Sequence, residues 1–251
     1  MRFFQRGLVL AALITSLAAA APARATGIFD CGPGGVNCGI TASIDGVNVA
    51  NGTYSIDPVT GAISLAAPIV VSLNGGTWSI QSLSGNADPI LGFATNASTG
   101  AAGNAFSVTF TLPIALAGLI NANSSVSYSL TGTTSAGAQI APLLGSNVVI
   151  AQEVDTSIGG LPPLNKGVDV GNTFFFVGGP QTQNSPVYTD SNSFVGNLAY
   201  DLMSVTVAFS LSPNSNVGIS GFVQQVVPEP TMVTLLGVGV VLLAVARRRT
   251  A

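Results

Sequence analysis

Residues that could carry out catalysis are scarce in this sequence. It contains no histidine, which excludes the Ser-His-Asp and Cys-His arrangements and the usual zinc sites. Glu153 and Asp155 form the one close pair of carboxylates, and residues two apart on a strand point to the same face. Glycosidase-like hydrolysis needs two facing carboxylates, but a solvated strand face explains this pair equally well. We therefore expect no catalytic residues and a protein that is not an enzyme.

Calcium is the metal that the scattered carboxylates are best suited to bind, since it takes oxygen ligands from aspartates and loop carbonyls. The candidate ligands are Asp155, Asp169, Asp190 and Asp201. They follow no EF-hand or nonapeptide pattern, and aspartates that simply solubilise a weakly charged surface are the more ordinary explanation. We expect no metal site and no cofactor, and we keep calcium binding as the alternative.

Aromatic side chains would matter if the protein bound carbohydrate, because sugar rings stack on exposed aromatic faces. Trp78 is the only tryptophan, and it lies in an alternating segment that predicts a core position. The three consecutive phenylalanines at 174–176 are too continuous for one face of a strand. At least one of these rings should therefore point outward, unless both faces of the strand are buried. The tyrosines that could serve are Tyr54, Tyr128, Tyr188 and Tyr200.

Residues 1–25 have the pattern of a cleavable signal peptide. Arg2 and Arg6 form a positive n-region, residues 8–17 form an apolar h-region, and Ala23-Arg24-Ala25 is an A-x-A cleavage site. The apolar run is too short for a membrane anchor. We expect cleavage by signal peptidase at this site and export of the mature chain.

Cys31 and Cys38 are the only cysteines, and they lie in a segment rich in glycine, proline and asparagine. An exported chain meets an oxidising compartment, so we expect a small disulfide loop near the mature N-terminus. A metal-binding pair is the alternative, but two thiolates without a nearby histidine make a poor site.

The C-terminal tail has three parts in a fixed order. A Pro228-Glu229-Pro230 motif precedes the apolar run 231–246, and the chain closes with a basic cluster of Arg247, Arg248 and Arg249. A helix over the apolar run barely spans a hydrocarbon core of about 30 Å, and the arginines should stay cytoplasmic. We expect a transmembrane helix that leaves the body of the protein outside.

This order and its terminal position resemble the PEP-CTERM sorting signal of Gram-negative bacteria. The resemblance covers about the last 25 residues. It implies that an exosortase recognises Pro228, Glu229 and Pro230 and processes the chain there, and that the protein is linked with exopolysaccharide and biofilm production. Two prolines keep the approach to the helix extended and poor in backbone donors, which suits a peptide presented to a protease. A plain tail anchor is the alternative.

The charges are segregated along the chain. Between residues 26 and 227 Lys166 is the only base and stands against nine acidic residues, which gives that segment a net charge of -8. An acidic body repels phosphate-bearing ligands, so nucleic acid is not an expected partner.

The body has the pattern of an all-β protein. Short runs rich in valine, isoleucine, threonine, phenylalanine and serine recur between turn residues, and segments such as 106–112 alternate apolar and polar residues. Residues 55–63 place aspartate, proline and glycine between two runs and predict a hairpin. The expected strands are 39–44, 52–56, 62–65, 69–73, 77–83, 91–95, 105–112, 124–133, 147–154, 173–177, 192–194, 203–211 and 215–226.

These features predict a signal peptide at 1–25, a β-sandwich or jelly-roll-like extracellular domain at 26–226, and a sorting signal at 227–251. The expected protein passes transiently through the inner membrane to the cell surface or medium, where extracellular polysaccharide is an expected partner. We expect a structural or adhesive role, which rests on the family resemblance alone. A carbohydrate-binding or calcium-binding module is the alternative.

Overall fold

The computed structural model describes residue 31 and residues 38–86, 89–114, 118–144, 147–155, 162–197 and 199–226. The predicted signal peptide with Ala23 and Ala25, the 228–230 motif, the apolar run and the arginine cluster lie outside these residues. The strands all fall within one compact unit, Ile28–Pro228. Within the described residues no helix is long and apolar enough to cross a membrane.

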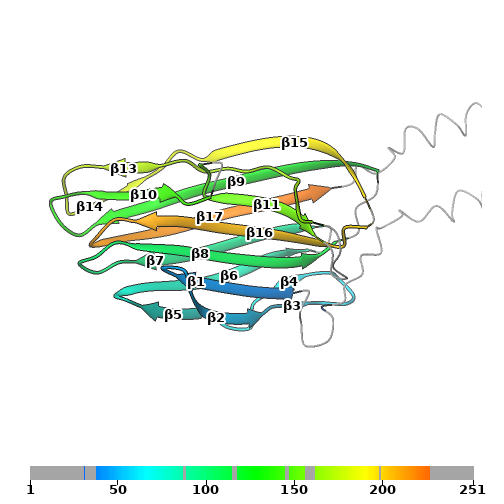
Figure 1. Cartoon of the computed structure of the whole chain (residues 1–251), viewed down its shortest axis with the longest axis horizontal. Coiled ribbons are helices and arrows are strands. Elements are labelled where there is room, and N and C mark those ends of the chain that lie inside the picture. Colours follow the sequence, from blue (N-terminus) through cyan, green and yellow to red (C-terminus); the bar gives the residue numbers. More distant parts are fainter. Residues whose placement is uncertain are drawn as a thin grey trace, which may run out of the picture. The chain divides into compact units, whose positions relative to one another are not determined.

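The described strands form two large antiparallel sheets and one small hairpin (Figure 1). The first sheet has eight strands in the order β12-β11-β16-β8-β1-β2, and β10 pairs with β16 and with β13. Its strands are β1 (Gly39–Ile44), β2 (Val47–Thr53), β8 (Asn104–Pro113), β10 (Ala138–Pro142), β11 (Ile150–Asp155), β12 (Leu164–Asn165), β13 (Phe174–Phe176) and β16 (Leu202–Leu211).

The second sheet has seven strands in the order β14-β9-β17-β7-β6-β5, and β15 also pairs with β9. Its long strand β9 (Gly118–Gly132) pairs with β17 on one side and with β14 and β15 in succession on the other. The remaining strands are β5 (Ile69–Leu73), β6 (Gly76–Asn86), β7 (Ile90–Ser98), β14 (Gln181–Asn184), β15 (Tyr188–Gly196) and β17 (Ser215–Val226).

The core lies between the two sheets because each strand turns its alternate apolar residues inward. In β8 the inward residues Phe106, Val108, Phe110 and Leu112 are fully buried, and the residues between them are threonine or serine. Aromatic rings from opposite sheets meet there: Phe93 of β7 stacks on Phe110, with 5.7 Å between ring centroids. This packing makes the unit a β-sandwich and confirms the all-β prediction.

The predicted hairpin at 55–63 is present as β3 (Ser55–Ile56) and β4 (Ile63–Ser64), which pair antiparallel. The Asp57 carboxylate shapes the turn by accepting hydrogen bonds from the backbone N–H groups of Val59 and Thr60, both 2.8 Å. These two bonds lower the pKa of Asp57.

Strands at the sheet margins differ most from the predictions. β10, β12 and β14 were not predicted, and β15 was predicted only at 192–194 although it runs from Tyr188 to Gly196. All four residues of β14 are exposed, as are most of β15. An edge strand that buries few side chains needs little apolar alternation, so its sequence carries only a weak strand signal.

Candidate functional site

The aromatic residues considered for sugar stacking lie mostly in the interior. Trp78, Tyr54, Tyr128 and Tyr200 are buried, and Tyr188 is half-buried beside Tyr128, with 5.4 Å between the ring centroids. Burial raises the pKa of the Tyr54 and Tyr128 hydroxyls. These rings therefore stabilise the core and form no exposed platform.

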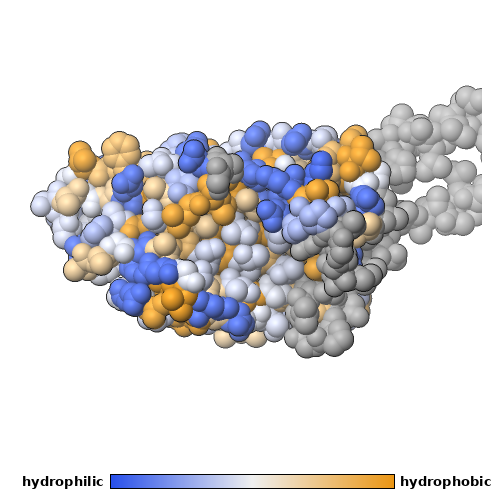
Figure 2. All heavy atoms as spheres, in the orientation of Figure 1, coloured by the Kyte–Doolittle hydropathy of each residue, from blue (hydrophilic) through white to orange (hydrophobic). Residues whose placement is uncertain are grey.

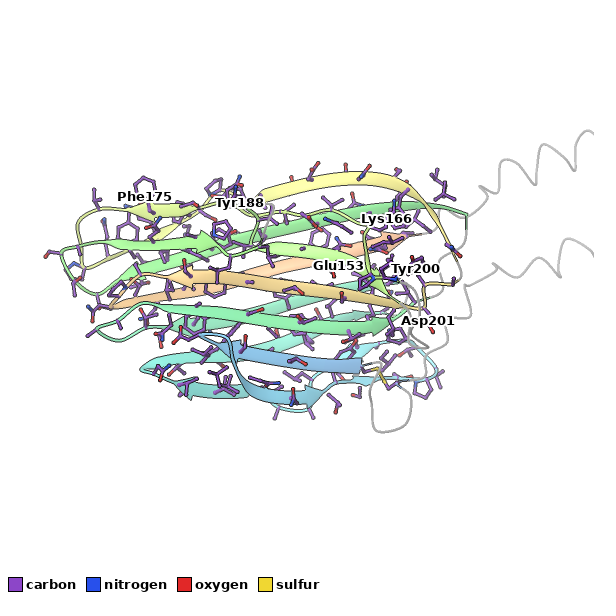
Figure 3. The ribbon with its side chains drawn as sticks, in the orientation of Figure 1. Glu153, Lys166, Phe175, Tyr188, Tyr200 and Asp201 are labelled. Carbon is purple, nitrogen blue, oxygen red and sulfur yellow. A yellow bond between two sulfur atoms is a disulfide. The ribbon has the colours of Figure 1, made fainter. Side chains whose placement is uncertain are left out.

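The three consecutive phenylalanines at 174–176 differ in exposure, as the sequence pattern predicts. Phe176 is buried, Phe174 is half-buried, and Phe175 is 63% exposed on β13. Phe175 lies opposite Gln139 of β10, so its ring points outward at the margin of the eight-stranded sheet. Figure 3 places it at the end of the sandwich opposite Glu153, Tyr200 and Asp201.

The carboxylates do not gather into a site. Glu153 of β11 is exposed and lies opposite Ser204 and Asn165, and the Asp155 side chain lies outside the described residues. Asp169 accepts hydrogen bonds from the Gln152 N–H and the Asn165 amide, both 3.2 Å. Across the described part of the chain no group of three or more metal-ligating residues could hold an ion.

A buried polar network ties a loop to the core between the sheets. The Gln152 amide donates to Ser124 Oγ, Ser124 Oγ donates to the Val168 carbonyl at 2.6 Å, and Gln225 Nε2 donates to Gln152 Oε1 at 3.0 Å. Gln225 Nε2 also reaches the Lys166 carbonyl at 3.1 Å. The sequence signal for this network is a glutamine at an inward position of an alternating strand, and Gln152 and Gln225 both occupy such positions.

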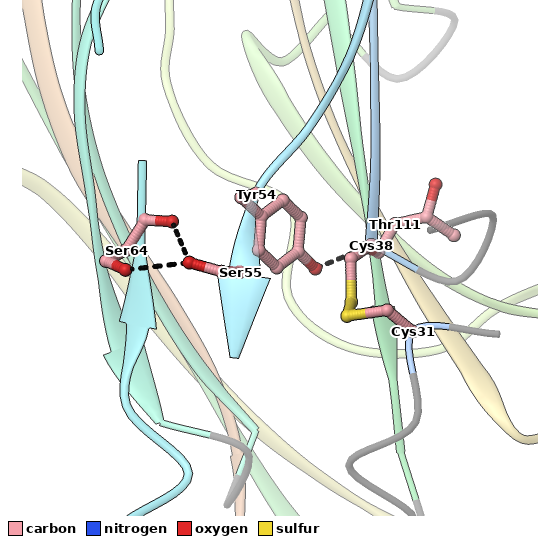
Figure 4. Close-up of a disulfide and its surroundings, with 6 residues drawn as sticks. All are labelled: Cys31, Cys38, Tyr54, Ser55, Ser64 and Thr111. Atoms are coloured by element: carbon pink, nitrogen blue, oxygen red, sulfur yellow. Dashed lines mark hydrogen bonds between the residues drawn. A yellow bond between two sulfur atoms is a disulfide. The ribbon is translucent and has the colours of Figure 1, made fainter. Parts of the chain in front are cut away.

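The N-terminal end of β1 is held by a disulfide between Cys31 and Cys38 (Figure 4). Cys38 is fully buried. Beside it the Tyr54 hydroxyl donates a hydrogen bond to the Thr111 carbonyl of β8. The disulfide therefore fixes the entry of the chain to the edge of the core.

The outer face of the seven-stranded sheet is lined mostly by uncharged polar side chains, and we call it the polar face. In the described strands its outward side chains include no charged group. Those with a hydroxyl or amide are Ser72 of β5; Thr77, Ser79, Gln81, Ser82, Ser84 and Asn86 of β6; Asn96 and Ser98 of β7; Asn121, Asn123, Ser125, Ser127, Ser129 and Thr131 of β9; Thr182 and Asn184 of β14; Thr189, Ser191 and Ser193 of β15; Asn216, Ser220 and Gln224 of β17.

Hydrogen bonds between neighbouring strands link side chains of the polar face. The hydroxyl groups of Ser72 and Thr77 are 3.0 Å apart, and those of Thr131 and Thr182 are 2.7 Å apart. Near the other end of the sheet Ser193 Oγ donates to Asn121 Oδ1 at 2.9 Å. The face is thus an ordered array of groups that both donate and accept hydrogen bonds.

The outer face of the eight-stranded sheet is also weakly polar but differs in composition. Thr41, Thr109 and Thr206 form a row across three strands, and the last two hydroxyls are 3.0 Å apart. Alanines interrupt the neighbouring rows, and Glu153 adds a charge. Figure 2 shows pale side chains of intermediate hydropathy across the middle of this face.

The described residues form a β-sandwich with two outer sheet faces and no cluster of metal-ligating side chains. Residues 226–249 match the PEP-CTERM protein-sorting motif. The chain therefore carries the sorting signal of an exosortase substrate, and the recognition made from its last residues is confirmed. This signal marks an exported, exosortase-processed surface protein. No curated protein matches the sequence significantly.

The solved structures that match this chain resemble it only distantly. TmCBM61 in complex with β-1,4-galactotriose is 13% identical over 52% of this chain and 69% of that one, with a TM-score of 0.23. The enzymatically active domain of tailspike protein 4 from bacteriophage CBA120 is 8% identical over 62% of this chain and 20% of that one, with a TM-score of 0.26. The adhesin domain of Epf from Streptococcus pyogenes is 10% identical over 74% of this chain and 56% of that one, with a TM-score of 0.29. These values are too low to support a functional argument.

Proposed function

We propose that this protein is a non-enzymatic component of the bacterial cell surface or extracellular matrix, with a structural or adhesive role in the exopolysaccharide layer. The observation that carries the proposal is the sorting motif at residues 226–249, because it directs the chain to exosortase processing. Signal peptidase acts first at the A-x-A site, the C-terminal helix then holds the chain in the inner membrane, and exosortase processing releases the body to the exterior.

The body supports a role in binding or structure rather than catalysis. The chain has no histidine, and Glu153 lies exposed on a flat strand face. General acid and base catalysis needs groups held at a reacting centre with tuned pKa values. Broad sheet faces of small polar residues instead provide contact area, which is what adhesion to a matrix requires.

The proposal is tested by the intact mass of the protein recovered from the envelope and medium of its native host. We expect the wild-type mature chain to begin after Ala25 and to end near Pro230, without Arg247, Arg248 and Arg249. The variant Glu229→Ala should retain the arginines and stay in the membrane, whereas the matched control Glu153→Ala should be processed normally. If the wild type keeps its arginines, the tail is a plain anchor and the proposal fails.

The matrix role needs a separate measurement. A host strain that lacks the protein should retain less polysaccharide at its surface than the parent strain, and the wild-type gene should restore the amount. Equal matrix mass in both strains would leave the protein an exported surface protein without a matrix role.

A further inference from the structure

We propose that the polar face of the seven-stranded sheet binds an uncharged polysaccharide, and that Phe222 is the ring on which a sugar unit stacks. This inference rests on the proposed matrix role and assigns it to one surface and one class of ligand. It is carried by the composition of the polar face, by the exposure of Phe222 and by the distribution of charge.

Phe222 lies near the middle of the polar face. β17 has β7 on one side and β9 on the other, so Phe222 lies in register between Gly92 and Ser125, and the row continues to Thr189 of β15. The side chain is 40% exposed. Gly92 has no side chain to cover the ring on its side, and serine covers little on the other, so one aromatic surface is open among small polar residues.

The rest of the face matches the chemistry of a neutral sugar chain. Each sugar unit presents hydroxyl groups that donate and accept hydrogen bonds, together with patches of C–H groups that stack on aromatic rings. Hydroxyl and amide side chains on strands about 4.8 Å apart offer the complementary groups repeatedly. The rows through Ser127 and Ser220 on one side of Phe222, and through Asn123 and Gln224 on the other, place such groups around the ring.

Charge favours an uncharged ligand over an anionic one. Asp45 and Asp57 lie in turns, and Asp190 lies at the sheet edge beside the face, while the outward side chains of the face itself include no base. The one base of the body, Lys166, lies over the Phe194 ring and not on the outward side of the face. A polyanion would therefore approach an acidic body without a cation on the polar face to pair with its charges. Nucleic acid and acidic polysaccharides are therefore disfavoured.

A protein partner fits this surface less well. The centres of protein interfaces are enriched in aromatic residues, methionine and arginine and are depleted of serine. The exposed aliphatic residues of the polar face lie at its margins, with Val70 on the edge strand β5 and the Leu119–Val195 pair at one end of β9 and β15. The centre of the face has one ring, Phe222, among serine, threonine, asparagine and glutamine side chains. The same argument disfavours a second copy of this chain as the occupant.

The opposite face provides an internal control. Its rows contain Ala105, Ala141, Ala151 and Ala208, which offer no hydrogen-bonding groups, and Glu153 adds a negative charge. Thr41 of β1 and Ser220 of β17 are both exposed strand residues on opposite faces. Aspartate at either position adds the same negative charge. A loss of binding at position 220 alone is therefore an effect of the polar face and not of the charge itself.

The test is affinity gel electrophoresis of the full-length protein in nonionic detergent. The gels contain amylose, dextran or hydroxyethyl cellulose as uncharged polymers, or alginate as an anionic one. We expect at least one uncharged polymer to retard the wild type and alginate to leave it unretarded. Phe222→Ala should bind about two- to tenfold more weakly, as expected for the loss of one stacking contact. Ser220→Asp should bind more weakly still, whereas Thr41→Asp and Phe175→Ala should bind like the wild type.

The inference is overturned if no uncharged polymer retards the wild type, or if Phe222→Ala and Ser220→Asp bind unchanged while circular dichroism shows all variants folded. A concentration-dependent dimer in sedimentation that Ser220→Asp dissolves, without polymer binding, would instead make the face a self-association surface. If the binding fails while the wild type is still processed at Pro230 and retained in the matrix, the proposed function stands and only this assignment is wrong.

Discussion

Trp78 of β6 packs edge-on against Phe106 of β8, with 5.5 Å between ring centroids and an interplanar angle of 86°. The two residues belong to different sheets, and Phe209 of β16 also contacts Trp78 at 5.6 Å. The three rings fill the centre of the sandwich where their sheets face each other. The indole is thus the largest side chain of the interior rather than a surface for a ligand.

Replacing Trp78 with alanine should lower the free energy of unfolding by about 3–5 kcal/mol. Loss of the ring leaves a cavity between the two sheets that the surrounding side chains fill only in part. The measurement is chemical denaturation of the purified protein followed by circular dichroism. Phe175→Ala is the matched control, since that ring is 63% exposed and its loss should cost less than about 0.5 kcal/mol. Equal effects of the two substitutions would contradict the packing described here.

Asp45 should make the stability depend on acid pH. The Ala105 N–H and the side-chain amides of Asn104 and Asn74 hydrogen-bond its carboxylate, and these bonds lower the pKa of Asp45. A lowered folded-state pKa stabilises the fold above the unfolded value of about 3.9, and this contribution is lost as the pH falls through the folded value. The melting temperature of the wild type should therefore fall more steeply below about pH 4 than that of Asp45→Asn.

Asp57 also has a lowered pKa, but it is present in both proteins, so its contribution cancels in this comparison. Asn74→Ala removes one donor to Asp45 and should give an intermediate pH dependence. Parallel curves for the wild type and Asp45→Asn would show that the Asp45 carboxylate does not stabilise the fold.

The disulfide should contribute modestly, because it closes a short loop. Cys31 and Cys38 are seven residues apart, and loop-closure entropy for a loop of this size predicts about 2–3 kcal/mol. Cys31→Ser should lower the unfolding free energy by this amount, and a reducing agent should lower that of the wild type equally without affecting the variant. An effect of the reducing agent on Cys31→Ser would point to a cause other than this disulfide.

The exposed edge at β15 is protected by its own side chains. Asp190 Oδ1 accepts a hydrogen bond from the Ser191 N–H at 2.8 Å, and Asn192 Oδ1 accepts one from the Ser193 N–H at 2.7 Å. These bonds occupy backbone donors that could otherwise pair with a strand of another molecule. The double variant Asp190→Ala, Asn192→Ala should therefore form dimers or larger species at about tenfold lower concentration than the wild type.

Analytical ultracentrifugation measures this change. The control is Thr189→Ala, Ser191→Ala, which changes the same strand but leaves both capped N–H groups in place. A monomeric Asp190→Ala, Asn192→Ala variant at concentrations where the wild type begins to associate would exclude the capping role.

The sequence determined the parts of this protein that local chemistry specifies. The sorting motif is a linear signal at the end of the chain, and it was recognised from its residues alone. Strands with one buried face, such as β8 and β16, were predicted because burial requires an apolar residue at every second position. The hairpin at 55–63 followed from turn residues that fix its backbone locally.

Tertiary structure decided the rest, because the deciding contacts join residues far apart in the chain. Asn104 reaches the Asp45 carboxylate across 59 positions, and no local pattern predicts that pairing. The edge strand β14 has no buried residue and β15 half-buries only Tyr188, Phe194 and Gly196, so pairing with β9 is what makes them strands. The polar face exists only because registers across seven strands bring hydroxyl and amide side chains from Ser72 to Gln224 onto one side.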